Sequence, residues 1–266
     1  MAPTATPPAR EPDRYVQRDQ PHGVPPLELT GERTLPDVPE ENYWFQRHLV
    51  VYRWIAGQVA GQDVVDLACG EGYGSAELAT GAGSVVGVDA NPQAHEHARL
   101  RYRSPNLSFE RDLVENFQGP CDAVVFLQTI EHMQEPGELL SAISAGLRPG
   151  GRAFISTPNV LTLAPRGAQR SGNPWHVREY RAEEFAGLLW AHFSSVELHG
   201  LFHARMLRAH ELAIRAGWDR IHPLLGVTLP FYQRFTASIG SRDFRLRRGE
   251  PAPLTKALDF VAVCRP

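Results

Sequence analysis

The chain has 266 residues, of which 42% are hydrophobic, so it is long enough to bury one substantial core. Its formal net charge is −3 and no basic face is evident in its central part, which argues against DNA or RNA as the main partner. No apolar run approaches the ~20 residues that a membrane-spanning helix needs.

The N-terminal part of the chain divides into two regions. Residues 1–28 are rich in proline, threonine and charged residues, and we expect them to be a disordered tail. Residues 29–60 form a capping region with a helix that begins near Glu41, because apolar residues recur there close to every 3.6 positions. His48 and Tyr52 lie one turn apart and share a face of this helix. These two side chains either pack within the protein or contact a ligand, and the pattern does not distinguish the two alternatives.

Residues 64–89 contain a strand, a glycine-rich turn and a second strand. The first apolar run ends near Asp66 and the second ends at Asp89. In a parallel sheet, such a turn brings backbone N–H groups to a ligand, and the distal acid accepts hydrogen bonds from both ribose hydroxyls. This segment predicts a nucleotide pocket.

The spacing of the glycines identifies the kind of nucleotide. A dinucleotide fingerprint would need a third glycine at position 75, which is Ser75. Small residues instead alternate after Asp66, namely Ala68, Gly70, Gly72 and Gly74. This set resembles the first motif of the class I S-adenosylmethionine-dependent methyltransferases, in which alanine at position 68 is a departure from the more usual glycine. The resemblance implies that the turn cradles the methionine end of the cofactor and that Asp66 helps to hold its amino group.

Three further strands follow in the order that this family shows. One ends near Asp112, the next covers residues 122–127 and leads into Gln128 and Thr129, and the last covers residues 153–157. The resemblance implies that Asp112 receives the adenine amino group. The complete set of expected cofactor-binding residues is Asp66, Ala68, Gly70, Gly72, Asp89, Ala90, Asp112, Leu113, Gln128, Thr129, His48 and Tyr52.

The resemblance also implies the architecture of residues 61–266. We expect an α/β, Rossmann-like class I methyltransferase domain with a seven-stranded, mostly parallel sheet of order 3-2-1-4-5-7-6 and an antiparallel last strand. Residues 202–254 separate the last two strands and are too long for a structureless loop, so we interpret them as a lid over the acceptor side, with an oligomer contact as the alternative. Helices are expected over 204–216 and within 223–239, and the arginine-rich residues 242–248 are expected to be an exposed charged stretch.

Candidate acceptor-side residues follow the fourth and fifth strands. A hydroxyl acceptor needs a general base, and His132, His176 and Glu179 are the catalytic candidates. His132 either contacts the acceptor or orders its own loop. Residues 173–180 also carry Trp175 and Tyr180, which offer flat apolar surface to a ring or a sugar face. His95 and His97, by contrast, are expected at the surface of a helix.

The sequence gives little support for a metal ion. Glu131, His132, His176 and Glu179 could converge, but no compact ligand spacing demands an ion, so we predict no metal. Cys69, Cys121 and Cys264 lie in or beside expected buried strands and form no metal-binding spacing, which indicates free thiols in the cytoplasm.

A narrower resemblance extends over most of the chain. Segments 30–33, 41–45, 156–159, 173–176 and 200–203 look like a bacterial group proposed to O-methylate sugars of intracellular polymethylated glucans, the methylglucose lipopolysaccharide type. The segment from Arg205 to Leu254 does not match that group. We therefore expect a class I S-adenosylmethionine-dependent methyltransferase that acts on a hydroxyl of a sugar, an oligosaccharide or another small metabolite. The alternatives are an O- or N-methyltransferase of a quinone, phenol or secondary metabolite, and a catalytically silent cofactor-binding partner subunit.

Overall fold

The computed structural model describes residues 14–15, 20, 22–29, 33–165 and 167–266. Most of the expected disordered tail, and the segment 30–32 of the narrower resemblance, lie outside these residues. No helix in the described part of the chain is long and apolar enough to cross a membrane.

The described residues form one large sheet of eight strands in the order β5-β4-β3-β6-β7-β10-β8-β9. The first five strands of that order are parallel, and β10 is antiparallel to both β7 and β8. The strand bounds are β3 Asp63–Leu67, β4 Ser84–Val88, β5 Leu107–Glu110, β6 Cys121–Leu127, β7 Leu147–Pro158, β8 Ser195–His203, β9 Phe244–Arg248 and β10 Asp259–Arg265. The expected order of seven strands with an antiparallel last strand is thus confirmed.

The eighth strand, β9, differs from the expectation of an exposed charged stretch. It pairs antiparallel with β8 at the edge of the sheet. Phe244 is buried and Leu246 half-buried, whereas Arg245 and Arg247 between and after them are exposed. This alternation is that of a strand with one buried face, and charged residues are common on edge strands because they discourage pairing with other chains.

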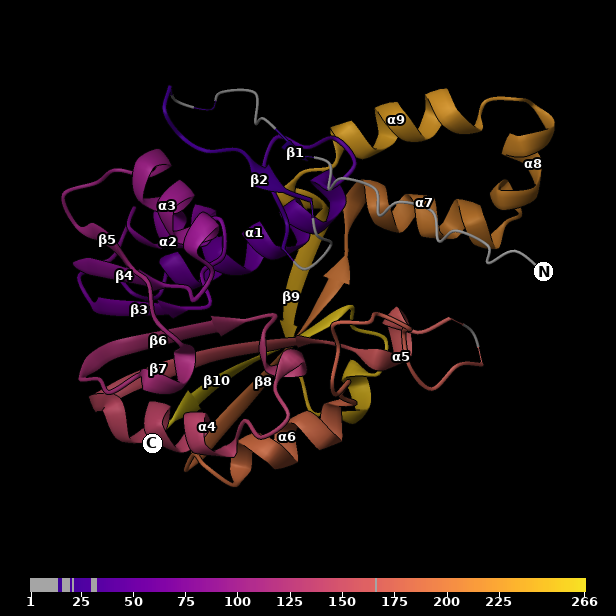
Figure 1. The fold of residues 1–266 in the computed structure, drawn as a ribbon. Coiled ribbons are helices and arrows are strands. Elements are labelled where there is room, and N and C mark those ends of the chain that lie inside the picture. The colour runs from indigo at the N-terminus through magenta and orange to yellow at the C-terminus, as the bar shows by residue number, and fades with distance from the viewer. Residues whose placement is uncertain (1–13, 16–19, 21, 30–32, 166) are drawn as a thin grey trace, which may run out of the picture.

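Helices cover both faces of the sheet (Figure 1). α4 (Gly137–Gly146) and α6 (Ala182–Trp190) pack on one face, and α1 (Asn42–Ala56) and α2 (Tyr73–Leu78) pack on the other. The central strand β6 shows why both faces need cover, since its successive side chains alternate between the two hydrophobic clusters. The other helical elements are α3 (Pro92–Arg101), α5 (Val160–Leu163), α7 (Arg205–Arg215), α8 (Trp218–Leu224), α9 (Thr228–Ser238), η1 (Val114–Asn116), η2 (Ile130–His132), η3 (Ser241–Asp243) and η4 (Ala252–Leu254).

Helix α1 begins at Asn42, as its sequence predicts, and a buried ion pair fixes it to the sheet. The Arg47 guanidinium donates to both carboxylate oxygens of Asp259 in β10, at 2.7 and 2.5 Å, and both side chains are almost fully buried. Two parallel N–H···O bonds define the orientation of the guanidinium as well as its distance. The pair therefore sets where α1 lies over the carboxyl ends of the strands.

The segment that precedes α1 is more ordered than expected. β1 (Arg14–Tyr15) pairs with β2 (Leu27–Glu28), and Leu27 is buried with Leu35 and Val38. The prediction of disorder is therefore wrong for the described residues 22–28. His97 is fully buried and donates through Nδ1 to the carbonyl of Pro25, so its expected surface position is also wrong.

Helices α7, α8 and α9 form an arm that extends away from the sheet (Figure 1). α7 matches the helix expected over 204–216, and the segment expected within 223–239 is the end of α8 followed by α9. The arm is tied to α1 because the Asn42 amide donates to the carbonyls of Thr236 and Ile239, at 2.7 and 3.0 Å.

Candidate active site

A cavity of about 340 Å³ lies where β3, β4 and β6 end, beneath α1. Such a volume suits a small-molecule ligand. Nine of the twelve expected cofactor residues line it: Ala68, Gly70, Asp89, Ala90, Leu113, Gln128, Thr129, His48 and Tyr52.

The turn between β3 and α2 has left-handed backbone at three small residues. φ is 56° at Ala68, 57° at Gly70 and 96° at Gly72. A Cβ atom at position 72 would lie 2.7 Å from the Cβ of Ala98, which only glycine avoids. A Cβ at position 70 would instead project into open space. Ala68 tolerates its conformation at a cost of roughly 1–2 kcal/mol, which explains why glycine is the more usual residue there.

Gly74 allows α1 to approach the turn. A Cβ at this position would lie 2.1 Å from Cζ of the Tyr52 ring, so the tyrosine occupies the space that a side chain would take. The Tyr52 hydroxyl then lies 3.3 Å from Oδ1 of Asp66. His48 lines the cavity one turn earlier on α1, and burial lowers the pKa of its imidazole to about 4, so the ring is neutral at pH 7.

Asp66 lies behind the wall of the cavity and is fully buried. The Ser75 hydroxyl donates to its Oδ2 at 2.6 Å, while Tyr52 donates to Oδ1. Burial raises the pKa of Asp66 to about 7 although both hydrogen bonds favour the charged form. The carboxyl group therefore contributes through the residues that it orders, Ser75 and Tyr52.

The Asp89 carboxylate is oriented by two backbone N–H groups at the end of β4. Gly70 donates to Oδ2 and Asn91 donates to Oδ1, both at 2.8 Å. Asp112 does not line the cavity. Its Oδ1 accepts from the Leu113 N–H and the Asn116 amide, at 2.8 and 2.6 Å, and so orders the turn that carries Leu113 to the cavity.

Several lining residues were missed by the sequence analysis. They are Arg33, Thr34, Val51, Cys69, Glu71, Tyr73, Asn91, Val114, Glu115, Leu127, Ser156 and Asp259. Glu71 and Tyr73 stand between the glycines and were within reach of motif analysis. Asp259 could have been found from topology, because an antiparallel strand begins at the edge where its parallel neighbours end.

His132 connects the cavity to the loop of residues 171–180. It lies in η2, directly after β6, and lines the cavity. Its Nδ1–H donates to the Trp175 carbonyl at 2.8 Å, so the neutral ring carries its lone pair on Nε2. The carbonyl of Glu131 accepts from the backbone N–H groups of Val177 and Arg178, at 2.9 and 3.0 Å, which holds this loop against η2.

His176 and Glu179 do not line the cavity, although both were expected on the acceptor side. His176 donates through Nδ1 to Glu179 at 2.8 Å, and its Nε2 lies 3.1 Å from the amide nitrogen of Asn173. Burial would raise the pKa of Glu179, but hydrogen bonds from Ser171 and His176 outweigh it and hold that pKa below its ordinary value. In this arrangement both side chains order the loop that carries Trp175.

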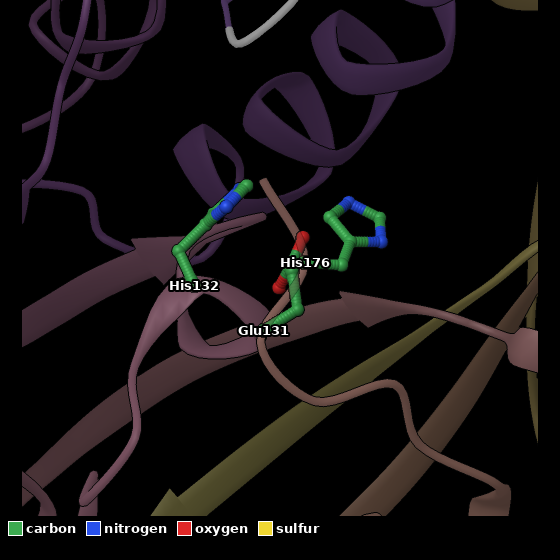
Figure 2. A group of neighbouring side chains, drawn as sticks. All are labelled: Glu131, His132 and His176. Carbon is green, nitrogen blue, oxygen red and sulfur yellow. The ribbon is translucent and has the colours of Figure 1, made fainter. Parts of the chain in front are cut away.

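Glu131, His132 and His176 lie side by side (Figure 2), and His132 lines the cavity. One potential metal-ligand atom from each lies within 4.8 Å of the other two. Glu131 is almost fully buried, and burial raises the pKa of its carboxyl group to about 8. The sequence indicated that these residues could converge, but it predicted no metal because their spacing along the chain is not compact. The fold brings His176 beside η2.

The cavity fits S-adenosylmethionine on the evidence of its own residues. The backbone of the β3–α2 turn is open at Gly70, where a ligand can approach the main chain closely. The Asp89 carboxylate has fixed oxygens in the same cavity, suited to a pair of ribose hydroxyls.

Comparisons with known proteins give one consistent result. Residues 43–212 match the family model described as a methyltransferase domain. A probable S-adenosylmethionine-dependent methyltransferase from Mycolicibacterium smegmatis is 36% identical over 247 residues, which cover 89% of this chain and 94% of the relative. A ubiquinone biosynthesis O-methyltransferase from Albidiferax ferrireducens is 31% identical over 170 residues, 59% of this chain and 67% of the relative.

A solved structure supports the fold. A methyltransferase from Thermotoga maritima, described as a possible histamine N-methyltransferase, superimposes with a TM-score of 0.56 at 15% identity and covers 85% of this chain and 94% of its own. At that identity the likeness concerns architecture alone.

Proposed function

From the premise that this chain belongs to the S-adenosylmethionine-dependent methyltransferases, we propose that it transfers a methyl group to a hydroxyl of a sugar or another small metabolite. The choice of a hydroxyl rests on the position of His132. This side chain lines the cavity and donates a hydrogen bond to the carbonyl of Trp175. Trp175 is 48% exposed, so the loop that bonds to His132 also offers an aromatic side chain to an acceptor. Aromatic side chains of this kind suit the apolar face of a sugar or a ring.

The proposed roles of the cofactor residues follow from their places. The β3–α2 turn with Gly70 and Gly72 cradles the methionine end, Asp89 accepts from the ribose, and Leu113 with the turn ordered by Asp112 flanks the adenine. Gln128 and Thr129 complete the wall beside the adenine. His48 and Tyr52 on α1 cover the cofactor and exclude water from it. Asp66 supports the turn from behind through its hydrogen bonds with Ser75 and Tyr52.

S-adenosylmethionine supplies a methyl group that is already activated on a sulfonium, so the protein mainly has to position the acceptor. Orientation of this kind contributes roughly 7–11 kcal/mol at best. Transfer to a hydroxyl would break the sulfur–methyl bond and form an oxygen–methyl bond, and the hydroxyl proton would pass to solvent. His132, held by the loop that His176 and Glu179 order, is the side chain that we expect to face this hydroxyl. The arm of α7–α9 is proposed as a lid on the acceptor side.

Phenol or quinol O-methylation is the second candidate, favoured by the relative from A. ferrireducens and equally compatible with an exposed indole. The glucan acceptor of the narrower resemblance is a special case of the first candidate. We place the reaction in the cytoplasm, where the three buried free cysteines would stay reduced.

The proposal is tested in two steps. Calorimetric titration with S-adenosylhomocysteine, with NAD as control, should show micromolar binding, about −8 kcal/mol, of the former alone. Transfer of labelled methyl groups to a panel of α-glucan oligosaccharides, monosaccharides, quinols and amines should then label a hydroxyl. Labelling of amines alone would contradict the hydroxyl proposal, and cofactor binding without any transfer would favour a silent partner subunit.

A further inference from the structure

We propose that Glu131, His132 and His176 bind one divalent transition-metal ion at the edge of the cofactor cavity, and that this ion holds the acceptor oxygen. The second part of this inference rests on the proposed function. The first part concerns only the residues of this chain and is tested without any acceptor.

The three side chains have the separation that an ion requires. Metal bonds of about 2.0–2.2 Å to nitrogen and oxygen place neighbouring ligand atoms roughly 3–4 Å apart. The potential ligand atoms here lie within 4.8 Å of one another, so closure by at most roughly 1–2 Å would bring them to that spacing. Two of the ligands lie in η2 and the third in a loop that two hydrogen bonds hold to η2, which keeps them together.

Both histidines are oriented as metal-binding histidines usually are. His132 donates Nδ1–H to a backbone carbonyl, and His176 donates Nδ1–H to the Glu179 carboxylate, both at 2.8 Å. Partners of this type fix the tautomer and make Nε2, rather than Nδ1, the ring nitrogen suited to a metal. The amide of Asn173 lies 3.1 Å from Nε2 of His176, so it competes with the ion and has to move aside when the ion binds.

The burial of Glu131 provides an independent reason for a cation. A buried carboxylate is costly unless a cation or a metal compensates its charge. Among the described residues, no lysine or arginine forms an ion pair with Glu131, and its Oε2 accepts from the Thr157 hydroxyl at 3.2 Å. An ion between Glu131 and the two imidazoles would supply a positive charge to the ionised form of this carboxyl group.

The ligand set indicates the class of ion and its role. Two imidazoles and one carboxylate favour Mn²⁺, Fe²⁺, Co²⁺ or Zn²⁺ over Mg²⁺ or Ca²⁺, which prefer oxygen ligands. Three protein ligands leave positions open for water or for an acceptor oxygen, as in catalytic zinc sites. Because His132 also lines the cavity, an oxygen on this ion would lie beside the methyl donor, and the ion would make its hydroxyl more acidic.

The test is a titration of the EDTA-treated, full-length chain with CoCl₂ and ZnCl₂, followed by calorimetry and by the visible absorption of Co²⁺. We expect one ion per chain with a dissociation constant in the micromolar range. His176→Ala and Glu131→Gln should each raise this constant by more than 100-fold, and Glu179→Gln should raise it about 10–100-fold by loosening His176. S-adenosylhomocysteine affinity should stay within a few-fold, which shows that the variants are folded.

Two variants serve as controls. Asn173→Ala removes the competing amide and should leave ion binding as tight or tighter. His192→Ala removes a histidine that bonds to Ser141 outside the cavity, and it should change nothing. If Glu131→Gln fails to fold, His176→Ala and Glu179→Gln decide the outcome alone.

The inference is overturned if the wild-type chain binds neither ion below millimolar concentration, or if His176→Ala binds as tightly as the wild type. Failure of the proposed function gives a different result. If the chain binds Co²⁺ through these residues but labels only amines, the ion site is supported and the hydroxyl acceptor is refuted. If the chain methylates a hydroxyl at full rate in excess EDTA, the proposed function is supported and the role of the ion in the reaction is refuted.

Discussion

Asp89 and Asp112 both follow strands, but the structure gives them different surroundings. Asp89 lines the cavity with both oxygens fixed by backbone N–H groups, whereas Asp112 is exposed and acts through the turn that carries Leu113. The sequence placed them at equivalent positions because each is an acid near a strand end. Which acid faces the ligand depends on how the following turn folds.

We predict that Asp89→Ala raises the dissociation constant of S-adenosylhomocysteine about 10–100-fold or more, because a hydrogen bond to a charged group contributes about 1.5–3 kcal/mol. Asp112→Ala is the matched control and should raise it by less than about fivefold. Calorimetric titration measures both. Equal losses in the two variants would contradict the assignment of the ribose to Asp89.

The raised pKa of Asp66 predicts a specific dependence of stability on pH. The ordinary pKa of the unfolded chain is 3.8 and burial raises it to about 7 in the folded protein. Between these values the folded state binds more protons than the unfolded state, so this group lowers the free energy of unfolding as pH rises from about 4 to 7. The free energy of unfolding of Asp66→Asn, relative to that of the wild type, should therefore increase by up to about 3 kcal/mol when the pH is raised from 5 to 8. Urea unfolding at both pH values measures this difference, and an identical difference at both would refute the shifted pKa.

The strands and helices that set the site were largely readable from the sequence. Apolar runs that end in acids predicted β3 and β4, the apolar run before Gln128 predicted β6, and the helical period predicted α1. The edge strand β9 was missed because its arginines hide the alternation of Phe244 and Leu246. The ordered segment before α1 was missed because β1 and β2 are only two residues long each.

The Arg47–Asp259 pair predicts a large stability difference between two arginines of α1. Arg47→Met leaves the Asp259 carboxylate buried without its partner, which costs about 3–5 kcal/mol. Arg53→Met in the same helix removes a half-exposed arginine 3.4 Å from Glu77 and should cost less than about 1 kcal/mol. Urea unfolding distinguishes these outcomes. Comparable losses would show that Arg47 is no more important than a surface arginine.

The arm of α7–α9 is a proposed lid, yet none of residues 202–254 lines the cavity. Its exposed leucines, Leu224, Leu225 and Leu229, lie around the turn between α8 and α9, which Figure 1 shows far from the sheet. We predict that replacing residues 217–227 with a glycine–serine linker leaves S-adenosylhomocysteine affinity within twofold and raises the acceptor KM. A change in molecular mass by light scattering, with KM unchanged, would identify the arm as an oligomer contact instead.

At the scale of the whole molecule, the parts of the site that sequence could not supply are those that join distant segments. His176 meets Glu131 only because the loop after β7 folds back onto η2, and Asp259 reaches the cavity only because β10 is inserted beside β7. A motif records neighbours along the chain, so it identified the cofactor turn and missed Asp259, and it indicated only that Glu131 and His176 could converge. Both of these contacts lie at the carboxyl edge of the sheet.

The cavity joins α1 to the sheet, so its occupation should stabilise the whole domain. A ligand that binds only the folded state at 100 times its dissociation constant adds about 2.7 kcal/mol, which corresponds to a rise in Tm of roughly 5–10 °C for a chain of this size. We expect S-adenosylhomocysteine to produce this rise and NAD to produce none. Asp89→Ala at the same ligand concentration should lose most of it. Because His48 and Tyr52 lie on α1, amide hydrogen exchange should slow in residues 42–56 as well as in the β3–α2 turn. Protection confined to the turn would show that α1 does not close over the cofactor.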